Sequence, residues 1–121
     1  MPEFDVTTRQ DDGVLVLDLH GDLDGGATDP MKRAQTKAAE LAPTVLVLNF
    51  AGLGYMNSTG IALIVGVLAE ARRLGTDVRV CGLSDHYRHI FEITRLADFV
   101  SFHADEHTAV DDQHTPTSGK A

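Results

Sequence analysis

The chain has 121 residues, 43% of them hydrophobic, which is enough for one compact domain with its own core and too little for two ordinary domains. Its 18 acidic and 10 basic residues give a formal net charge of -8, which disfavours nucleic acid and anionic membranes as partners because both would repel it. The single cysteine, Cys81, excludes an internal disulfide, and without a signal-peptide pattern or a long apolar run we expect a cytoplasmic protein that binds proteins or small molecules.

The N-terminal residues predict two strands and a loop. Phe4–Thr8 alternate apolar and polar side chains, Gln10–Gly13 supply turn residues, and Val14–Leu19 form an apolar run. This pattern is typical of an antiparallel hairpin whose first strand lies at a sheet edge. The next segment, His20–Gly26, is rich in glycine and aspartate and predicts a flexible acidic loop.

A helix is expected after this loop. Asp29 is its expected N-cap and Pro30 its first residue, and it should end near Ala42 because Pro43 follows. Its core-facing stripe is expected to comprise Met31, Ala34, Ala38 and Leu41.

Residues 44–75 predict a buried strand, a loop and a long helix. Val45–Leu48 is apolar without alternation, as in a strand covered on both faces. The strand is expected to end near Phe50, followed by a loop over Gly52–Ser58 and a helix over Ser58–Leu74 that Gly75 closes.

Apolar residues of this long helix spread over more than half of its circumference, so most of it should be buried; they are Ile61, Leu63, Ile64, Val65, Val67, Leu68 and Leu74. The remaining face is formed by Ser58, Ala62, Gly66, Ala69 and Arg73. An exposed mid-helix glycine is unfavourable, so Gly66 indicates close approach of another backbone. A partner protein and a neighbouring helix of the same domain both remain open as its source.

The C-terminal part predicts a strand over Asp77–Leu83 and a helix capped by Ser84 or Asp85. This helix should end near Thr94 and bury Tyr87, Ile90, Phe91 and Thr94. Leu96, Phe99, Val100 and Phe102 suggest a last short strand, and Asp105–Val110 one or two helical turns. The domain is expected to span residues 1–110, and residues 111–121 to form a disordered tail.

Strand and helix alternation after an initial hairpin predicts the α/β class. We expect a single domain with a mixed sheet, antiparallel at the edge strand and otherwise mostly parallel, packed with three or four helices.

The sequence Asn57-Ser58-Thr59-Gly60 places two hydroxyl groups at the start of the long helix. Helix N-termini carry unpaired N–H groups and a partial positive charge, which favour a capping oxygen or a phosphate. A capping role for Ser58 is the ordinary interpretation, and a phosphoryl acceptor is the alternative.

Three segments resemble elements of the STAS domain family of anti-sigma factor antagonists. Gly21-Asp22-Leu23-Asp24 matches its G-x-L-D element, Asn57-Ser58-Thr59-Gly60-Ile61 its D-S-S-G-L element, and His89–Ala97 its V-F-E-L-T-G-L segment. The resemblance covers roughly Phe4 to Val110 in order and spacing, and three elements in register are more specific than any one alone.

The resemblance implies that Ser58 is phosphorylated by an anti-sigma factor that is also a serine kinase of the histidine-kinase-like ATPase fold. It implies that the unphosphorylated chain binds this kinase and frees a sigma factor, that the phosphorylated chain lets go, and that a serine phosphatase is a further partner. The kinase supplies nucleotide and catalysis, so the chain is not expected to be an enzyme or to hold a cofactor. The implied partner-binding residues are Asp22, Asp24, Asn57, Ser58, Thr59, Ala62, Gly66, Ala69 and Arg73.

Two positions depart from the family pattern. Asn57 replaces the usual aspartate before the acceptor, which removes a carboxylate beside the phosphate site. Arg95 replaces a glycine where a left-handed turn is expected. Because of Asn57, a STAS scaffold or transporter-associated subunit that is never phosphorylated stays open as an alternative.

Other site chemistries have weaker sequence support. His86 and His89, or His103 and His107, have helical spacing for a metal, but no cysteine cluster or carboxylate set joins them, so no metal site is expected. Asp22 and Asp24 are more simply a solvated loop than a divalent-ion site. A hydrolase or transferase with Ser58 as nucleophile lacks a G-x-S-x-G element, and a receiver domain would need an acid where Asn49 stands.

Overall fold

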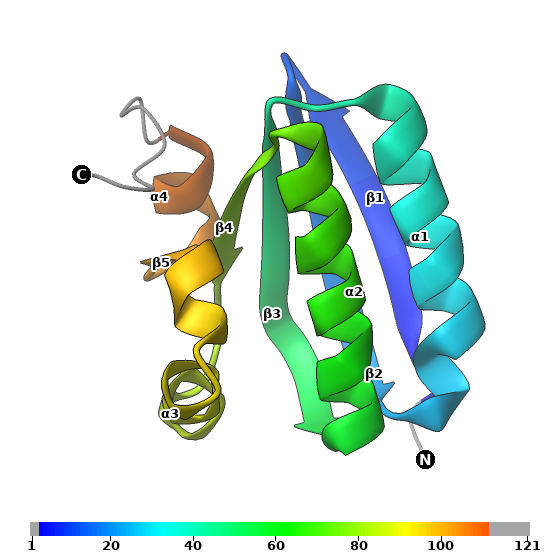
Figure 1. The fold of residues 1–121 in the computed structure, drawn as a ribbon, viewed down its shortest axis with the longest axis vertical. Coiled ribbons are helices and arrows are strands. Elements are labelled where there is room, and N and C mark those ends of the chain that lie inside the picture. Colours follow the sequence, from blue (N-terminus) through cyan, green and yellow to red (C-terminus); the bar gives the residue numbers. More distant parts are fainter. Residues whose placement is uncertain (1–2, 112–121) are drawn as a thin grey trace.

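Five strands lie side by side in the order in which they occur along the chain (Figure 1). The computed structural model describes residues 3–111, and its strands are β1 (Asp5–Asp11), β2 (Val14–Leu23), β3 (Val45–Met56), β4 (Asp77–Cys81) and β5 (Ser101–His103). β1 pairs antiparallel with β2, and all later pairs are parallel. The predicted α/β class, with a mixed sheet and an antiparallel edge strand, is confirmed.

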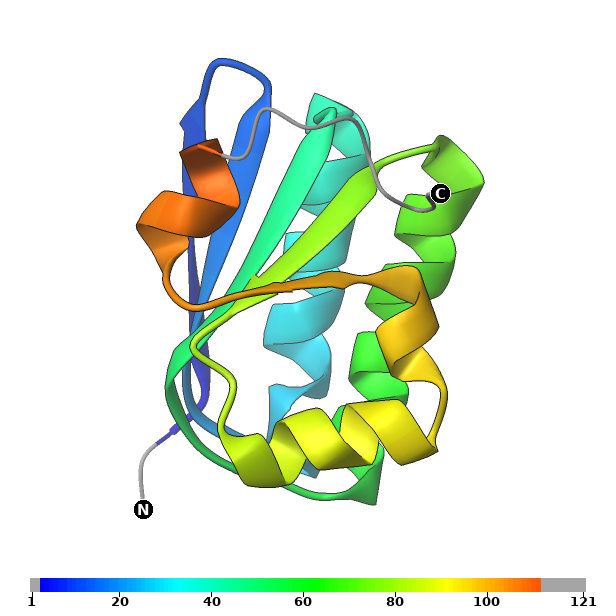
Figure 2. The same cartoon turned by 90° about the vertical axis from the view of Figure 1, so that its left-hand side faces the viewer.

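The helices cover the two faces of this sheet unequally. They are α1 (Thr28–Leu41), α2 (Ser58–Leu74), α3 (Asp85–Ile93) and α4 (Glu106–Asp111), with short 3-10 helices η1 (Gly25–Ala27) and η2 (Leu96–Phe99). In side view, α1 and α2 lie on one face and α4 on the other (Figure 2). No helix within residues 3–111 is both long enough and apolar enough to span a membrane.

The main core lies between the sheet and helices α1, α2 and α3. Leu17, Leu48, Ile64 and Phe91 are fully buried there, and the Phe91 ring meets Phe50 edge-on with 6.1 Å between ring centroids. The expected core stripe of α1 is confirmed, since Met31 and Ala34 are buried and Ala38 and Leu41 pack against the same core; the apolar stripe holds α1 on the sheet.

A smaller core lies on the opposite face, under α4. It contains Val16, Val47, Cys81 and Ala109, so β3 is covered on both sides. Double coverage explains why Val45–Leu48 reads as an unbroken apolar run. Burial raises the pKa of the Cys81 thiol to about 11, which keeps it protonated and unreactive at neutral pH.

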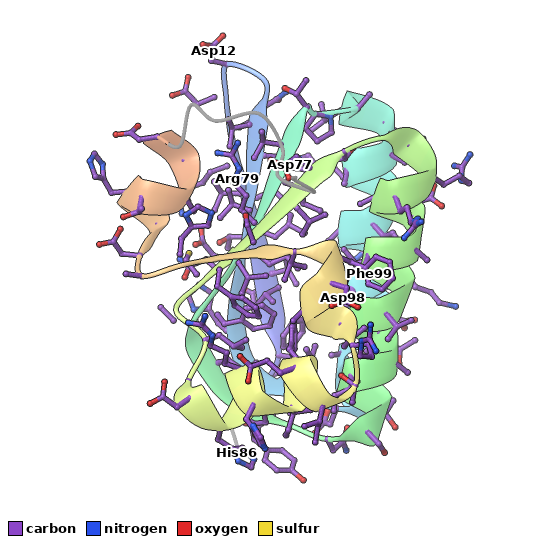
Figure 3. The ribbon with its side chains drawn as sticks, turned by 60° about the vertical axis from the view of Figure 1, so that its left-hand side comes forward. Asp12, Asp77, Arg79, His86, Asp98 and Phe99 are labelled. Carbon is purple, nitrogen blue, oxygen red and sulfur yellow. The ribbon has the colours of Figure 1, made fainter. Side chains whose placement is uncertain are left out.

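Polar contacts fix α4 to the sheet. Arg9 of β1 donates two hydrogen bonds to Asp18 of β2, at 2.7 and 2.8 Å, and two more to Glu106 of α4, both at 2.7 Å. Arg79 of β4 is almost fully buried, lies beside Asp77 (Figure 3) and donates to the Ala109 carbonyl oxygen at 2.7 Å. Charge-assisted contacts thus join the first strand, the fourth strand and the last helix.

The strands β2 and β3 are longer than predicted. The expected loop over His20–Gly26 is strand as far as Leu23, and the expected loop over Gly52–Ser58 is strand as far as Met56. Gly21 adopts a positive φ of 92°, where a Cβ would lie 2.7 Å from the Glu3 carbonyl oxygen. Glycines and two register irregularities let the pairing of β2 with β3 continue. Residue composition alone predicts loops for these segments.

The N-cap of α1 differs from the prediction, and the N-cap of α3 is one of the two residues predicted. Asp29 is not the N-cap of α1, because the helix begins at Thr28 directly after η1. Asp24 instead caps η1, its carboxylate accepting a hydrogen bond from the Gly26 N–H at 2.9 Å. Ser84 caps α3, as one of the two predicted choices, and the expected left-handed turn is confirmed at Arg95, with φ of 69°.

Four apolar or partly apolar side chains are more exposed than expected. Val65 and Leu74 of α2 are 43% and 41% exposed, because the sheet and α1 cover only part of this helix. Thr94 is exposed, and Phe99 lies in η2 rather than in the last strand, 45% exposed. Asp111, expected in the tail, ends α4; the rest of the expected disordered tail lies outside the described residues.

Candidate docking and phosphorylation site

The carboxyl ends of β2 and β3 meet the start of α2 through backbone contacts. The Asn57 N–H donates to the Leu23 carbonyl oxygen at 3.3 Å. A Cβ on Gly60 would lie 1.9 Å from the same oxygen, closer than any real contact, so a glycine is required there. The segments Gly21–Asp24 and Asn57–Gly60 are therefore two halves of one packed unit.

Asn57, and not Ser58, caps α2. The Asn57 side-chain oxygen accepts a hydrogen bond from the Gly60 N–H at 3.0 Å, and Asn57 has the extended backbone of an N-cap residue. Ser58 is the first helical residue and is exposed, and its hydroxyl forms no hydrogen bond to any residue among 3–111. The ordinary interpretation of Ser58 as a cap is wrong, and its hydroxyl is accessible to a partner.

Tyr87 of α3 holds the end of β3 in place. Its hydroxyl oxygen accepts a hydrogen bond from the Met56 N–H at 2.9 Å, one residue before Asn57. The helical spacing of Tyr87 predicts only a core role and gives no sign of this bond. Tyr55, which is 52% exposed next to the site, is a further candidate residue that the sequence does not reveal, because the composition of its segment predicts a loop.

Asp22 and Asp24 lie at the same end of the sheet as Asn57. Asp22 pairs with Tyr55 across the two strands, and its carboxylate lies over Gly54, where a Cβ would be 2.8 Å from Oδ1. The Asp24 carboxylate is engaged in its cap. Within the described part of the chain, no group of three or more His, Cys, Asp or Glu side chains is arranged to hold a metal.

The predicted small-residue face of α2 is only partly as expected. Ser58, Ala62, Ala69 and Arg73 are exposed, whereas Gly66 is half-buried beside α1. Gln35 of α1 donates to the Gly66 carbonyl oxygen at 3.3 Å, so a neighbouring helix of the same domain supplies the contact. That contact is a side chain, and a Cβ on Gly66 would still have 3.9 Å of room, so no close backbone demands this glycine.

Arg73 is far from the acceptor serine. A helix rises about 1.5 Å per residue, which places Arg73 roughly 22 Å along α2 from Ser58. Its guanidinium is paired with Glu70, at 2.6 Å, on the same helix. The structure thus brings Asp22, Asp24, Asn57, Ser58 and Thr59 together and leaves Arg73 at the other end of the face.

The STAS domain family model matches residues 5–109. This chain belongs to the STAS domain family. The match spans the sheet from β1 into α4 and includes both halves of the packed unit at Gly21–Asp24 and Asn57–Gly60. The family predicted from three short segments is confirmed.

Two relatives of this STAS domain carry the name anti-sigma-B factor antagonist. It is 27% identical over 108 residues to the anti-sigma-B factor antagonist of Staphylococcus aureus, covering 89% of this chain and 98% of that protein. It is 30% identical over 97 residues to the anti-sigma-B factor antagonist of Listeria monocytogenes, covering 80% and 84% of the two chains.

Solved structures share the STAS fold. An anti-sigma factor antagonist from Mycobacterium paratuberculosis has a TM-score of 0.76 at 16% identity, over 88% of this chain and 91% of that one. The Bacillus cell fate determinant SpoIIAA in its phosphorylated form has a TM-score of 0.72 at 23% identity, over 90% and 99%. At these identities the likeness concerns the fold.

The capping assignment in this STAS domain predicts unequal effects on stability at two adjacent residues. Asn57→Ala removes the oxygen that accepts from the Gly60 N–H and should lower the free energy of unfolding by about 1 kcal/mol. Ser58→Ala removes a hydroxyl without a partner in the described structure and should change it by less than about 0.5 kcal/mol. Urea denaturation of both variants checks this, and a larger loss at Ser58 would contradict the assignment.

Proposed function

We propose that this STAS domain is an anti-sigma factor antagonist switched by phosphorylation of Ser58. The observation that carries the proposal is the exposed, unbonded Ser58 hydroxyl at the first residue of α2, beside a separate residue that performs the capping. A serine engaged as a cap would have to leave its hydrogen bond to react, whereas this one is presented to solvent. The names of the Staphylococcus and Listeria relatives support the same function.

The partner in this proposal is an anti-sigma factor that is a serine kinase of the histidine-kinase-like ATPase fold. The unphosphorylated domain binds it and releases a sigma factor. Phosphorylation adds about two negative charges at a helix N-terminus, which favours anions, so the fold is retained. The added negative charge therefore acts on binding to the kinase and not on the fold. Asp22 and Asp24 already make the docking surface acidic. A serine phosphatase restores the binding form.

Asn57 is compatible with this switch. Capping needs a side-chain oxygen, which the carboxamide supplies to the Gly60 N–H as a carboxylate would. The amide removes one negative charge beside the phosphate, so it lowers the electrostatic cost of phosphorylating Ser58. Asn57 in place of aspartate thus keeps the cap beside Ser58 and changes only the charge next to the acceptor.

The proposed docking surface begins at the N-terminus of α2 and runs along one face of the helix. It comprises Asp22, Asp24, Asn57, Ser58 and Thr59 with the exposed Ala62 and Ala69, and small side chains there let a partner approach the helix closely. Gly66 and Arg73 also belong to the proposed surface, with Gly66 contributing its less covered side. Tyr55 and Val65, both exposed beside it, add apolar area that a partner would bury.

The test is intact-mass spectrometry after incubation with ATP and candidate serine-kinase anti-sigma factors from the same source. Wild type and Thr59→Ala should each gain one phosphoryl group, and Ser58→Ala none. Thr59 is the matched control, because it is an exposed hydroxyl residue one position further along α2. The phosphorylated domain should then bind the kinase at least about tenfold more weakly, or about 1.4 kcal/mol.

The alternatives give different results in the same experiment. Binding to a kinase without any mass gain would replace the switch with a constitutive scaffold or transporter-associated subunit. Turnover of an ester substrate without a partner, abolished in Ser58→Ala, would indicate a hydrolase or transferase. The missing base argues against that outcome, since no side chain within residues 3–111 is hydrogen-bonded to the Ser58 hydroxyl.

A further inference from the structure

One edge of the sheet is open beside a basic helix. β1 pairs with β2 alone, so its second edge has no strand neighbour within the described chain. α1 lies beside β1 on one face of the sheet (Figure 1). Between them runs a groove of about 200 Å³ whose lining includes Val6 and Thr8 of β1 and Arg33 and Lys37 of α1. An open strand edge is a template for pairing with another extended chain.

The cations in the lining of this groove outnumber the acids, because Arg33 and Lys37 line it with one carboxylate, that of Asp5. Lys32, Arg33 and Lys37 are all exposed, and none forms an ion pair with a residue in the described structure. Asp29 and Glu40 lie on the same helix, near its two ends, without pairing with them. With three cations against two acids, α1 therefore carries a net charge of +1 next to the open edge, in a chain whose net charge is -8.

We propose that the β1 edge and the groove beside α1 bind an acidic segment of a partner protein in extended conformation. The segment adds a strand to β1 through main-chain hydrogen bonds, and its acidic side chains on one face lie over Arg33 and Lys37. Strand addition supplies affinity from the backbone, and the alternating side chains supply specificity. The surface uses elements other than those around Ser58 and does not depend on the proposed switch.

Charge selects this occupant over a second copy of the chain. Antiparallel pairing of two β1 strands about Thr8 would set Asp5 opposite Asp11 and place both basic α1 helices on the same side of the joined sheet. Like charges opposite each other in a sheet are unfavourable. An acidic segment is attracted by Arg33 and Lys37 of the helix. Within the lining of the groove, only Asp5 repels it. The acidic residues are therefore expected over the Arg33 and Lys37 part.

The probe is a fluorescein-labelled peptide of 7 residues, the length of β1, in which glutamate and valine alternate. Its anisotropy is measured with the full chain, beside a peptide in which glutamine replaces glutamate. Two further peptides carry N-methyl groups on either the odd or the even residues. Strand addition uses the N–H groups of one set, so one methylated peptide should bind like the parent and the other about tenfold more weakly or not at all.

The variants Lys37→Glu and Lys32→Glu form a matched pair on the same helix. Both reverse one exposed charge, but Lys37 lines the groove beside β1 and Lys32 lines only the outer side of α1. We expect Lys37→Glu to weaken binding by about tenfold and Lys32→Glu by less than about threefold at 0.15 M salt, where the Debye length is about 8 Å. Circular dichroism confirms that both variants are folded.

Amide shifts in a nitrogen–proton spectrum of the labelled chain locate the peptide. Changes concentrated in β1 and along α1 support the proposal. Several results would overturn it: no saturable binding, equal binding of both methylated peptides, equal loss in the two lysine variants, or shifts confined to other elements. Sedimentation showing that the chain dimerises through β1, or binding to phosphatidylserine vesicles in place of the peptide, would also overturn it.

Discussion

Gly60→Ala is expected to destabilise the domain by more than about 3 kcal/mol, although it adds one methyl group near the start of α2. The new Cβ would lie 1.9 Å from the Leu23 carbonyl oxygen, and that carbonyl also accepts the Asn57 N–H. Backbone atoms on both sides leave no flexible group to move aside. The start of α2 must therefore shift away from β2, which breaks the Asn57 contact as well.

Gly66→Ala is the matched control in the same helix. The nearest atom to its added Cβ is 3.9 Å away, an ordinary contact, so alanine should raise the free energy of unfolding by up to about 1 kcal/mol. Urea denaturation of both variants gives the comparison. Equal effects at the two glycines would show that helix propensity, and not the Leu23 contact, decides the outcome at Gly60.

Arg9→Met is expected to lower the free energy of unfolding by about 2 to 3 kcal/mol at neutral pH. The Asp18 side chain is 12% exposed and receives two hydrogen bonds from Arg9, so the variant leaves a largely buried carboxylate with Asn49 as its main remaining donor. Glu106 loses its partner too, which should loosen α4. Arg73→Met is the control, because its ion pair with Glu70 is solvent-exposed and should contribute nothing measurable.

The ion pair between Arg9 and Asp18 makes the stability of the domain depend on pH. The hydrogen bonds from Arg9 lower the pKa of Asp18 below its usual value, and burial opposes them less strongly. A carboxyl group with a depressed pKa stabilises the fold above its unfolded pKa of about 3.9, and this contribution is lost as the pH falls through the folded pKa. The difference between wild type and Arg9→Met should therefore be largest at neutral pH and shrink below about pH 4. A difference that grows on acidification would refute the assignment.

The fold was predictable from sequence where one periodicity dominates. The unbroken apolar run of Val45–Leu48 gave a strand covered on both faces, and the stripe from Met31 to Leu41 gave the core face of α1. The strand β4 follows from the short apolar run expected over Asp77–Leu83, whereas of the residues expected in the last strand only Phe102 lies in β5. In these elements the polarity of each side chain determines whether it is buried, so the apolar pattern in the sequence predicts the structure.

The ends of β2 and β3 were not predictable in this way. Gly52, Gly54 and Gly21 have turn composition, yet they form strand. A Cβ at Gly52 or Gly54 would meet the side chain of His20 or Asp22 on the paired strand, and a Cβ at Gly21 would meet the Glu3 carbonyl oxygen. Long-range contacts decided this, and a single sequence does not show them. The capping residue was missed for a related reason, since Asn57 and Ser58 are both good N-caps and only the backbone geometry separates them.

The bond between Arg9 and Glu106 has a consequence for synthesis on the ribosome. These residues are 97 positions apart, so the first strand receives its last charged contact only after 97 further residues have been added to the chain. At about 5 to 20 residues per second, roughly 5 to 20 s pass between the appearance of Arg9 and that of Glu106. During that interval the hairpin of β1 and β2 carries an arginine with one of its two carboxylates. The nascent domain is then expected to remain sensitive to protease until α4 emerges from the exit tunnel.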